Sequence, residues 1–339
     1  MKKGILKVDG LGEFEGEFFG KETEVSGEIV FTTSPSGYLK SITDPSYRGQ
    51  ILVFSFPYIG SYGIEEDGES KDVQVRGVVL NRIPSIFKEK FSKYLEDNGV
   101  PGIILNDTRK IVDFTRKNGN KIGTIGNARM DNPYENNLVN EIQVNQTHLK
   151  KEGASKILLV DLGLKGNILK FLNEYDITII PYSDFSFNKI GDYDGIVISN
   201  GPGDPSHPDF IQFRDELRKS MLNIPMLGIC LGHQLIGLAS GMKTEKMKFG
   251  HRSINHPVKD AITGKIGITT HNHGFTVLFE EGKGLKMRYK SLNDGSNEGM
   301  QGENLLTTQF HPEGGPGPRD ELGVFDEFRR MVIQEDGYK

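Results

Sequence analysis

The stretch GICLG, residues 228–232, contains Cys230, the only cysteine of the chain. The apolar run PML precedes it and a helical pattern, HQLIGLASG, follows it. The spacing Gly-x-Cys-x-Gly predicts a tight strand-to-helix turn that holds a nucleophile above a sheet. A helix beginning there favours the thiolate, and the N–H of Leu231 then faces a developing oxyanion. A lone cysteine is also often a small buried apolar residue, so the turn alone leaves both interpretations open.

A thiol nucleophile needs a base, and His311 is the best candidate among eight histidines. It follows the strand-like run TTQF, and Glu313 comes two residues later, so both side chains leave an extended chain on the same side. A carboxylate there accepts the imidazole N–H and fixes the tautomer of the ring. A His–Glu pair at a surface strand end is the alternative, but a cysteine turn on a parallel sheet favours catalysis. We therefore predict a triad of Cys230, His311 and Glu313.

Two further patterns bear on ligands. SNGPGDP, residues 199–205, ends a buried strand, and Gly201 and Gly203 allow backbone amides to turn toward an anion, as a second oxyanion donor would. The chain has no G-x-x-x-x-G-K-[ST] sequence, so no ATP site is expected in it.

Metal binding is the alternative use for the histidines. The pairs His251/His256 and His271/His273 have suggestive spacing. No carboxylate or thiol set accompanies them in the sequence, so we expect no metal site in this chain.

The whole chain has the composition of a soluble globular protein of two domains. It has 339 residues, of which 36% are hydrophobic and 26% charged, with a net charge of −5. The negative charge and the lack of a Lys/Arg block argue against a nucleic-acid partner. No apolar run is long enough for a membrane helix, and no signal peptide is visible, so no membrane association is expected. One cysteine excludes internal disulfides, which favours a cytoplasmic location.

The elements that must position the triad divide the chain near its middle. Residues 1–148 predict a strand-rich α+β domain, with helices in SIFKEKFSKYLEDNG and in NDTRKIVDFTRKNG, the second capped by Asp107 or Thr108. The polar stretch 136–156 reads as a linker. Residues 155–339 alternate buried strands (KILLVDLG, ITIIPYS, GIVISNG, PMLGIC) with helical segments, which predicts a doubly wound, mostly parallel α/β sheet. Ligands bind such sheets at the carboxyl ends of the strands, where GICLG and NGPGD fall.

Together, NGPGDP, GICLGHQ and FHPE resemble the class I (triad) glutamine amidotransferases. The resemblance implies that Cys230 attacks the side-chain amide of L-glutamine, that His311 relays protons and that Glu313 orients His311. It also implies an oxyanion site at the backbones of Gly201 and Leu231. By position it assigns glutamine binding to Ser46, Gly201, Gly203, Leu231, Gln234, Asn272, Gly274 and Phe275. From the residues alone, Gln234 lies one helical turn beyond Cys230, and Asn272 and the amides near it could bind a carboxylate.

The rest of the chain is similar to the small chains of the carbamoyl-phosphate synthetases. The similarity rests on GEIVFTTSPSGYLKSITDPSYRGQILVFSFPYIGSYG, Glu69–Ser70, NDTRK, DLGLKGNIL, KMKFGHRSINHPVKD and HNHGFTV. It implies a heterodimer with a large subunit that uses ATP, Mg²⁺ and bicarbonate, no cofactor in this chain, and an N-terminal domain that docks to that subunit. Positions 252–254, 271 and 314 depart from the familiar pattern.

Three other functions compete with this interpretation. One is an amidotransferase subunit of another synthase, such as one making anthranilate or guanylate, although those usually lack this N-terminal domain. The second is a non-catalytic homologue, which the intact triad disfavours. The third is a standalone thiol hydrolase such as a γ-glutamyl peptidase, which the additional domain disfavours.

Overall fold

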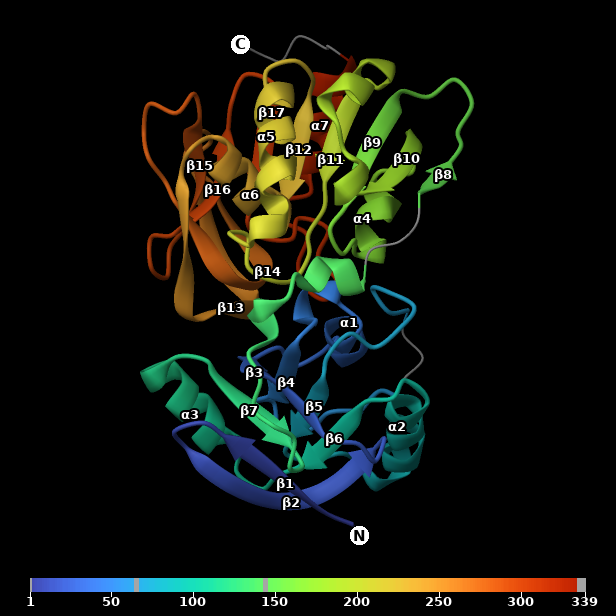
Figure 1. The fold of residues 1–339 in the computed structure, drawn as a ribbon, viewed down its shortest axis with the longest axis vertical. Coiled ribbons are helices and arrows are strands. Elements are labelled where there is room, and N and C mark those ends of the chain that lie inside the picture. The colour runs from blue at the N-terminus through green and yellow to red at the C-terminus, as the bar shows by residue number, and fades with distance from the viewer. Residues whose placement is uncertain (1, 64–66, 143–145, 334–339) are drawn as a thin grey trace. The chain divides into compact units, whose positions relative to one another are not determined.

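The computed structural model describes residues 2–63, 67–142 and 146–333. The chain forms two compact units (Figure 1). The first comprises residues 1–138 and 247–253, and the second residues 139–246 and 254–339. The strand-rich α+β domain followed by an α/β domain, expected from the sequence, is confirmed.

A closed barrel forms the first unit, with strand order β1-β2-β6-β5-β4-β3-β7. The strands are β1 (Lys3–Val8), β2 (Gly12–Gly20), β3 (Val25–Thr32), β4 (Gln50–Phe54), β5 (Gly77–Leu80), β6 (Pro101–Ile104) and β7 (Lys121–Ile125). Pairing along β3-β4-β5-β6 is parallel and the remaining pairs are antiparallel. Closure pairs the two edges of the sheet with each other, a feature that the sequence pattern of short strands did not reveal.

Three helices accompany the barrel: α1 (Tyr38–Ile42), α2 (Ser85–Asp97) and α3 (Thr108–Asn118). Phe91 and Leu95 of α2 pack into one apolar cluster of the unit, and Ile111 of α3 packs into another. Both predicted helices are confirmed. Of the two proposed caps of α3, it is Asp107 whose side chain accepts a hydrogen bond, from the N–H of Lys110 at 3.1 Å.

A ten-stranded mixed sheet organises the second unit, in the order β14-β13-β15-β16-β17-β12-β11-β9-β10-β8. Its strands are β8 (Thr147–Leu149), β9 (Lys156–Asp161), β10 (Asp176–Pro181), β11 (Gly195–Ile198), β12 (Met226–Ile229), β13 (Lys243–Asp260), β14 (Ile266–Leu278), β15 (Lys286–Ser291), β16 (Asn297–Gln301) and β17 (Leu305–Thr308). The central strands β17, β12, β11, β9 and β10 are parallel.

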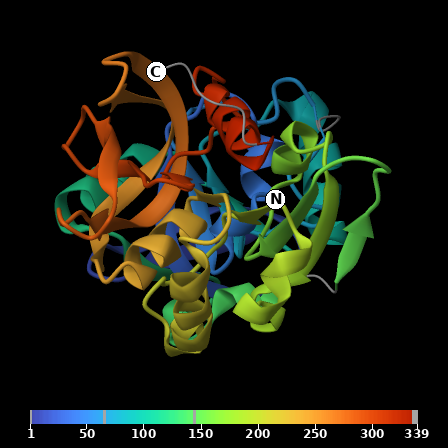
Figure 2. The same ribbon diagram turned by 90° about the horizontal axis from the view of Figure 1, so that it is seen from above.

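Helices cover both faces of this parallel core, as a doubly wound sheet requires (Figure 2). The helices are α4 (Gly166–Phe171), α5 (Ile211–Ser220), α6 (Leu231–Ala239) and α7 (Gly323–Ile333). One apolar cluster joins α5 and α6 to the sheet and another joins α4 and α7 to it. Alternate residues of each strand enter opposite clusters, for example Leu158 and Leu159 of β9, which explains why these strands are apolar throughout.

One feature differs from the sequence-based expectation. The stretch 136–156 is not only a linker, because it contains β8, which pairs antiparallel with β10 at the edge of the sheet. The first stretch of the first unit ends at residue 138, and the domain boundary at residue 148 stays a prediction. The antiparallel part of the mostly parallel sheet consists of additions beyond β17, among them β13, β15 and β16.

Candidate active site

Cys230 stands between β12 and α6 in a strained backbone conformation. Its φ of 53° and ψ of −99° make it the only non-glycine residue with positive φ in the described ranges. Such a conformation is costly for a residue with a side chain and occurs mostly at functional turns. The strain supports the predicted nucleophile turn over a plain buried cysteine, although the side chain is 98% buried.

The two glycines beside Cys230 are required by close packing. A Cβ at Gly228 would lie 2.5 Å from Cδ1 of Ile236, and one at Gly232 would lie 2.3 Å from the carbonyl oxygen of Ile198. Helix α6 therefore approaches β11 and β12 more closely than a side chain would permit. This close approach is the physical reason for the spacing Gly-x-Cys-x-Gly.

His311 and Glu313 form the predicted pair after β17. His311 Nδ1 lies 2.7 Å from Glu313 Oε1, and both side chains are buried. The carboxylate accepts the Nδ1–H, so Nε2 is the ring nitrogen left for proton transfer. The backbone holds the histidine too, because its N–H donates to the carbonyl of Thr270 at 2.9 Å.

A buried lysine completes this pair, and sequence reasoning missed it. Lys165, in the loop between β9 and α4, is fully buried with Nζ 3.0 Å from Glu313 Oε1. Its ammonium also donates to the carbonyl of Gly314 at 2.9 Å. DLGLKGNIL contributed only to the family resemblance, because a lysine between two glycine-containing turns usually faces solvent.

Neighbouring charges shift the pKa values of Glu313 and His311. Burial alone would raise the pKa of Glu313, but Lys165 and His311 outweigh it and lower that pKa. Burial and Lys165 oppose a charge on His311, yet the charge and hydrogen bond of Glu313 and the nearby thiol of Cys230 raise the pKa of His311 overall. The arrangement therefore favours an imidazolium ring beside the sulfur.

Three polar groups of the described residues lie near the sulfur of Cys230. Sγ donates to the carbonyl oxygen of Asn272 at 3.8 Å and accepts from Nε2 of Gln309 at 3.6 Å. His311 is near enough for the thiol to affect its pKa, while its Nε2 has no hydrogen-bond partner among the described residues. The thiol therefore lies beside a ring nitrogen with which it can exchange a proton.

The residues proposed to hold the oxyanion meet beside Cys230. β11 and β12 are adjacent parallel strands, so the loop with Gly201 and Gly203 lies next to the cysteine turn. A Cβ at Gly201 would lie 3.0 Å from Cδ2 of Leu231 and 1.9 Å from the carbonyl oxygen of Leu162. Gly203 has a φ of 100°, which favours glycine.

The predicted glutamine-binding residues of α6 and β14 are also brought together. Gln234 Nε2 donates to the carbonyl of Phe275 at 2.9 Å and to Gln309 Oε1 at 3.0 Å. Asn272, Gly274 and Phe275 lie along β14. Gln309 links Gln234 to Cys230 and was not identified from the sequence; its position two residues before His311, on the same side of an extended chain, was the available signal.

Ser46 is the exception among the predicted residues. It lies in a 3₁₀ turn, Pro45–Tyr47, of the first unit, and its N–H donates to Asp44 Oδ1 at 2.9 Å. That hydrogen bond is the local turn expected from the residues alone. Its role in glutamine binding stays a prediction.

The expectation of no metal rested on a premise that is wrong. His271 and His273 do have a carboxylate beside them, since Glu298 Oε2 lies 3.5 Å from His271 Nδ1 and 3.9 Å from His273 Nε2. The carboxylate comes from β16, 25 residues along the chain from His273.

Comparison with known proteins gives the family. Residues 158–331 match the model of the class-I glutamine amidotransferases, and residues 7–125 match the model of the carbamoyl-phosphate synthase small chain, CPSase domain. The carbamoyl phosphate synthase small chain of Listeria innocua is 38% identical, over 99% of this chain and 99% of its own length. The chain belongs to the carbamoyl phosphate synthase small-chain family. Proteins of the same name from Bacillus cereus and Bacillus caldolyticus are 39% and 38% identical, each over 98% of this chain and over 96% and 97% of their own lengths.

The match of residues 7–125 also bears on the alternatives. It covers most of the first unit, which subunits of the anthranilate or guanylate type were expected to lack. Within the described residues, no helix is long and apolar enough to cross a membrane.

Proposed function

We propose that this chain is the glutamine-hydrolysing subunit of a carbamoyl-phosphate synthetase, releasing ammonia from L-glutamine by triad chemistry. The observation that carries the proposal is the strained, glycine-flanked Cys230 beside the buried pair His311–Glu313. Cys230 supplies the nucleophile, His311 relays protons, and the negative charge of Glu313 stabilises the protonated ring of His311.

The first half-reaction forms a thioester. The Cys230 thiolate attacks the side-chain amide carbon of glutamine, and the carbonyl oxygen becomes an oxyanion that the amides of Gly201 and Leu231 stabilise. The C–N bond then breaks, and His311 donates its proton to the leaving nitrogen, which departs as ammonia. Glu313 keeps the ring oriented and balances its charge while the proton is present.

The second half-reaction regenerates the enzyme. Neutral His311 takes a proton from water, which attacks the γ-glutamyl thioester, and glutamate leaves as the sulfur is released. Gln234 and Asn272, with the amides of Gly274 and Phe275, are proposed to bind the α-amino and α-carboxylate groups of glutamine, together with Gly203. For Ser46, a role in glutamine binding is proposed from the family resemblance alone.

A partner must consume the ammonia. The family's name as a small chain implies a large subunit, and we propose that this partner uses ATP, Mg²⁺ and bicarbonate to make carbamoyl phosphate. The chain itself has no phosphate-loop sequence, consistent with nucleotide binding elsewhere. We assign docking to the first unit, and a cytoplasmic location follows from the single cysteine.

Glutaminase activity of the chain, alone and with a carbamoyl-phosphate synthetase large subunit, tests the proposal. We expect Cys230→Ser to lower ammonia release by at least about 10³-fold, as loss of a triad member does. His148→Gln, which changes a His–carboxylate pair with Asp176 outside the site, is the matched control and should leave the rate unchanged.

The outcomes separate the two parts of the proposal. Ammonia release that survives in Cys230→Ser overturns the triad mechanism. The synthetase assignment is overturned if the chain hydrolyses glutamine normally but a large subunit neither stimulates it nor makes carbamoyl phosphate with it. That result would leave the triad mechanism intact.

A further inference from the structure

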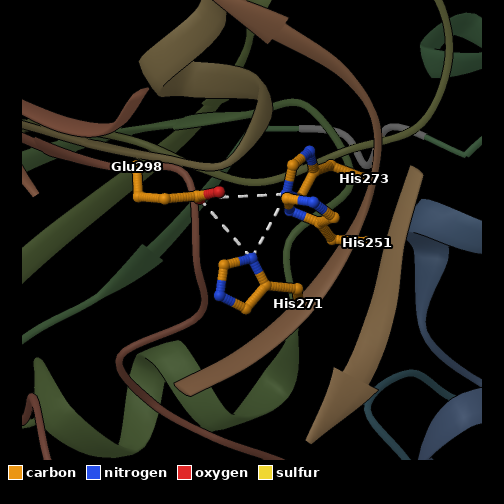
Figure 3. A group of neighbouring side chains, drawn as sticks. All are labelled: His251, His271, His273 and Glu298. Atoms are coloured by element: carbon orange, nitrogen blue, oxygen red, sulfur yellow. Dashed lines mark hydrogen bonds and ion pairs between the residues drawn. The ribbon is translucent and has the colours of Figure 1, made fainter. Parts of the chain in front are cut away.

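Two histidines and a glutamate converge in the second unit close to the candidate active site. His271 and His273 leave β14 on the same side, and Glu298 reaches them from β16 (Figure 3). All three side chains are buried. The figure also draws His251, from residues 247–253 of the first unit, but the three side chains of the second unit are enough to hold an ion.

Hydrogen bonds to the far sides of the rings determine which nitrogens carry protons. His273 Nδ1 lies 2.9 Å from the carbonyl oxygen of Phe275, which can only accept, so the proton is on Nδ1. Thr269 Oγ1 donates to the carbonyl of His256 at 2.9 Å and lies 2.7 Å from His271 Nε2. Since the hydroxyl proton is used, Nε2 of His271 is the donor in that contact.

The nitrogens facing each other are therefore both lone-pair acceptors. His271 Nδ1 and His273 Nε2 are 3.2 Å apart, and the carboxylate oxygen Oε2 of Glu298 faces both. Two imidazole nitrogens and a carboxylate oxygen that converge in this way form a donor set that a divalent metal ion binds in proteins.

The spacing suits a metal ion. Tetrahedral zinc with bonds of about 2.0–2.2 Å places neighbouring ligand atoms about 3.3 Å apart. The three ligand-atom separations are 3.2, 3.5 and 3.9 Å, so shifts of about half an ångström or less would form three corners of a tetrahedron. Two imidazole nitrogens favour zinc over magnesium or calcium, which prefer oxygen.

Each of the three ligands also has an orienting partner of the kind that metal sites use. Thr269 holds His271, the Phe275 carbonyl holds His273, and Ser296 Oγ donates to Glu298 Oε1 at 2.9 Å. Such outer contacts fix the ring orientation and the tautomer before the ion arrives. We propose that His271, His273 and Glu298 form a zinc site.

The proposed ion would act as a positioning element for β14. Asn272 lies between the two histidines, and its carbonyl accepts from Cys230 Sγ. The Phe275 carbonyl is shared by His273 and by Gln234, a proposed glutamine-binding residue. This role rests on the proposed function: removal of zinc should raise KM for glutamine about tenfold and change kcat much less, because no ligand touches the reacting atoms.

Zinc binding is tested on the full chain carrying Cys230→Ser, which removes the catalytic thiol as a competing zinc ligand. After EDTA treatment and dialysis, the chain is titrated with ZnCl₂, and bound metal is counted by mass spectrometry after gel filtration. We expect one zinc per chain, affinity at least about 100-fold lower in His271→Gln and Glu298→Gln, and a loss of about 10-fold in Thr269→Val. His148→Gln is the matched control and should bind normally.

A spectroscopic measurement keeps the test decisive if a buried variant fails to fold. Co²⁺ added to the Cys230→Ser chain should give a tetrahedral visible spectrum that zinc abolishes. Failure to bind zinc, or equal binding in both ligand variants, overturns the site. Because the measurement uses a chain without the catalytic thiol, its result stands whatever the glutamine assay shows.

Discussion

Replacing Glu313 with glutamine tests whether the group behind Cys230 is held by charge. The substitution keeps an oxygen for the Nδ1–H of His311, at 2.7 Å in the wild type, but removes the anion that lies 3.0 Å from the buried ammonium of Lys165. Breaking a buried pair by removing one partner costs about 3–5 kcal/mol. For a unit of this size each kcal/mol lowers Tm by about 2–4 °C, so the transition of the second unit should fall by about 6–20 °C.

Differential scanning calorimetry of wild type, Glu313→Gln and a double variant with Lys165→Met measures this loss. The double variant removes both charges and should recover most of the lost stability, since an apolar isostere of a buried pair is often tolerated. Lys219→Met is the matched control, because it removes an exposed lysine paired with Glu216 and should cost less than about 1 kcal/mol. A double variant less stable than Glu313→Gln alone would refute the reasoning.

The pH dependence gives the same prediction a second readout. The pKa of Glu313 falls from its usual 4.5 to about 2 in the folded chain, despite burial, because of Lys165 and His311. A lowered carboxyl pKa means that its stabilisation is complete above pH 4.5 and is lost as pH falls toward 2. The difference in Tm between wild type and Glu313→Gln should therefore shrink across that window, and a constant difference would contradict the assignment.

Three further substitutions test other positions of the second unit. Burial lowers the pKa of His233 from 6.5 to about 3, so the wild type should lose stability as pH falls through that range. His233→Leu should lose less stability over the same range in thermal melts at matched ionic strength, and parallel losses would count against this explanation. Gly232→Ala places a Cβ 2.3 Å from the carbonyl oxygen of Ile198, so it should lower Tm and reduce glutaminase activity more than about tenfold. A near-normal rate would show that the turn tolerates a side chain. Gln309→Leu removes a hydrogen-bond donor 3.6 Å from Cys230 Sγ. In steady-state assays it should lower kcat/KM for glutamine about fivefold, equivalent to about 1 kcal/mol of transition-state stabilisation. An unchanged kcat/KM would rule out a positioning role for this amide.

The features of the site that the sequence predicted depend on residues close together in the chain. The cysteine turn is encoded within five residues, and the close approach of α6 to β11 and β12 explains both of its glycines. His311 and Glu313 share a strand end, so the two-residue period sufficed to pair them. Alternating buried strands and helices likewise predicted the parallel core that brings the loop of Gly201 beside Cys230.

What the sequence could not predict depends on distant segments. Lys165 is 148 residues from Glu313, and nothing in its flanking residues indicates that an ammonium is fully buried there. β8 is three exposed residues whose strand conformation comes from pairing with β10 rather than from apolar alternation. In both cases tertiary context overrides the local preference, which in each case is for a solvated loop.

The His271–His273–Glu298 group also joins distant segments, but part of it can be predicted from the sequence. Two histidines at a spacing of two in a strand place two ligand atoms on one face, so the useful question is which other strand supplies a third. β14 and β16 are separated by β13 and β15 in the sheet order, so pairing rules would not bring Glu298 to the histidines. The strands meet because the antiparallel part of the sheet curls, and β14 contacts β16 directly. A zinc ion held by both strands would stabilise that curl, so its removal should loosen β14 at Asn272 before it affects the parallel core.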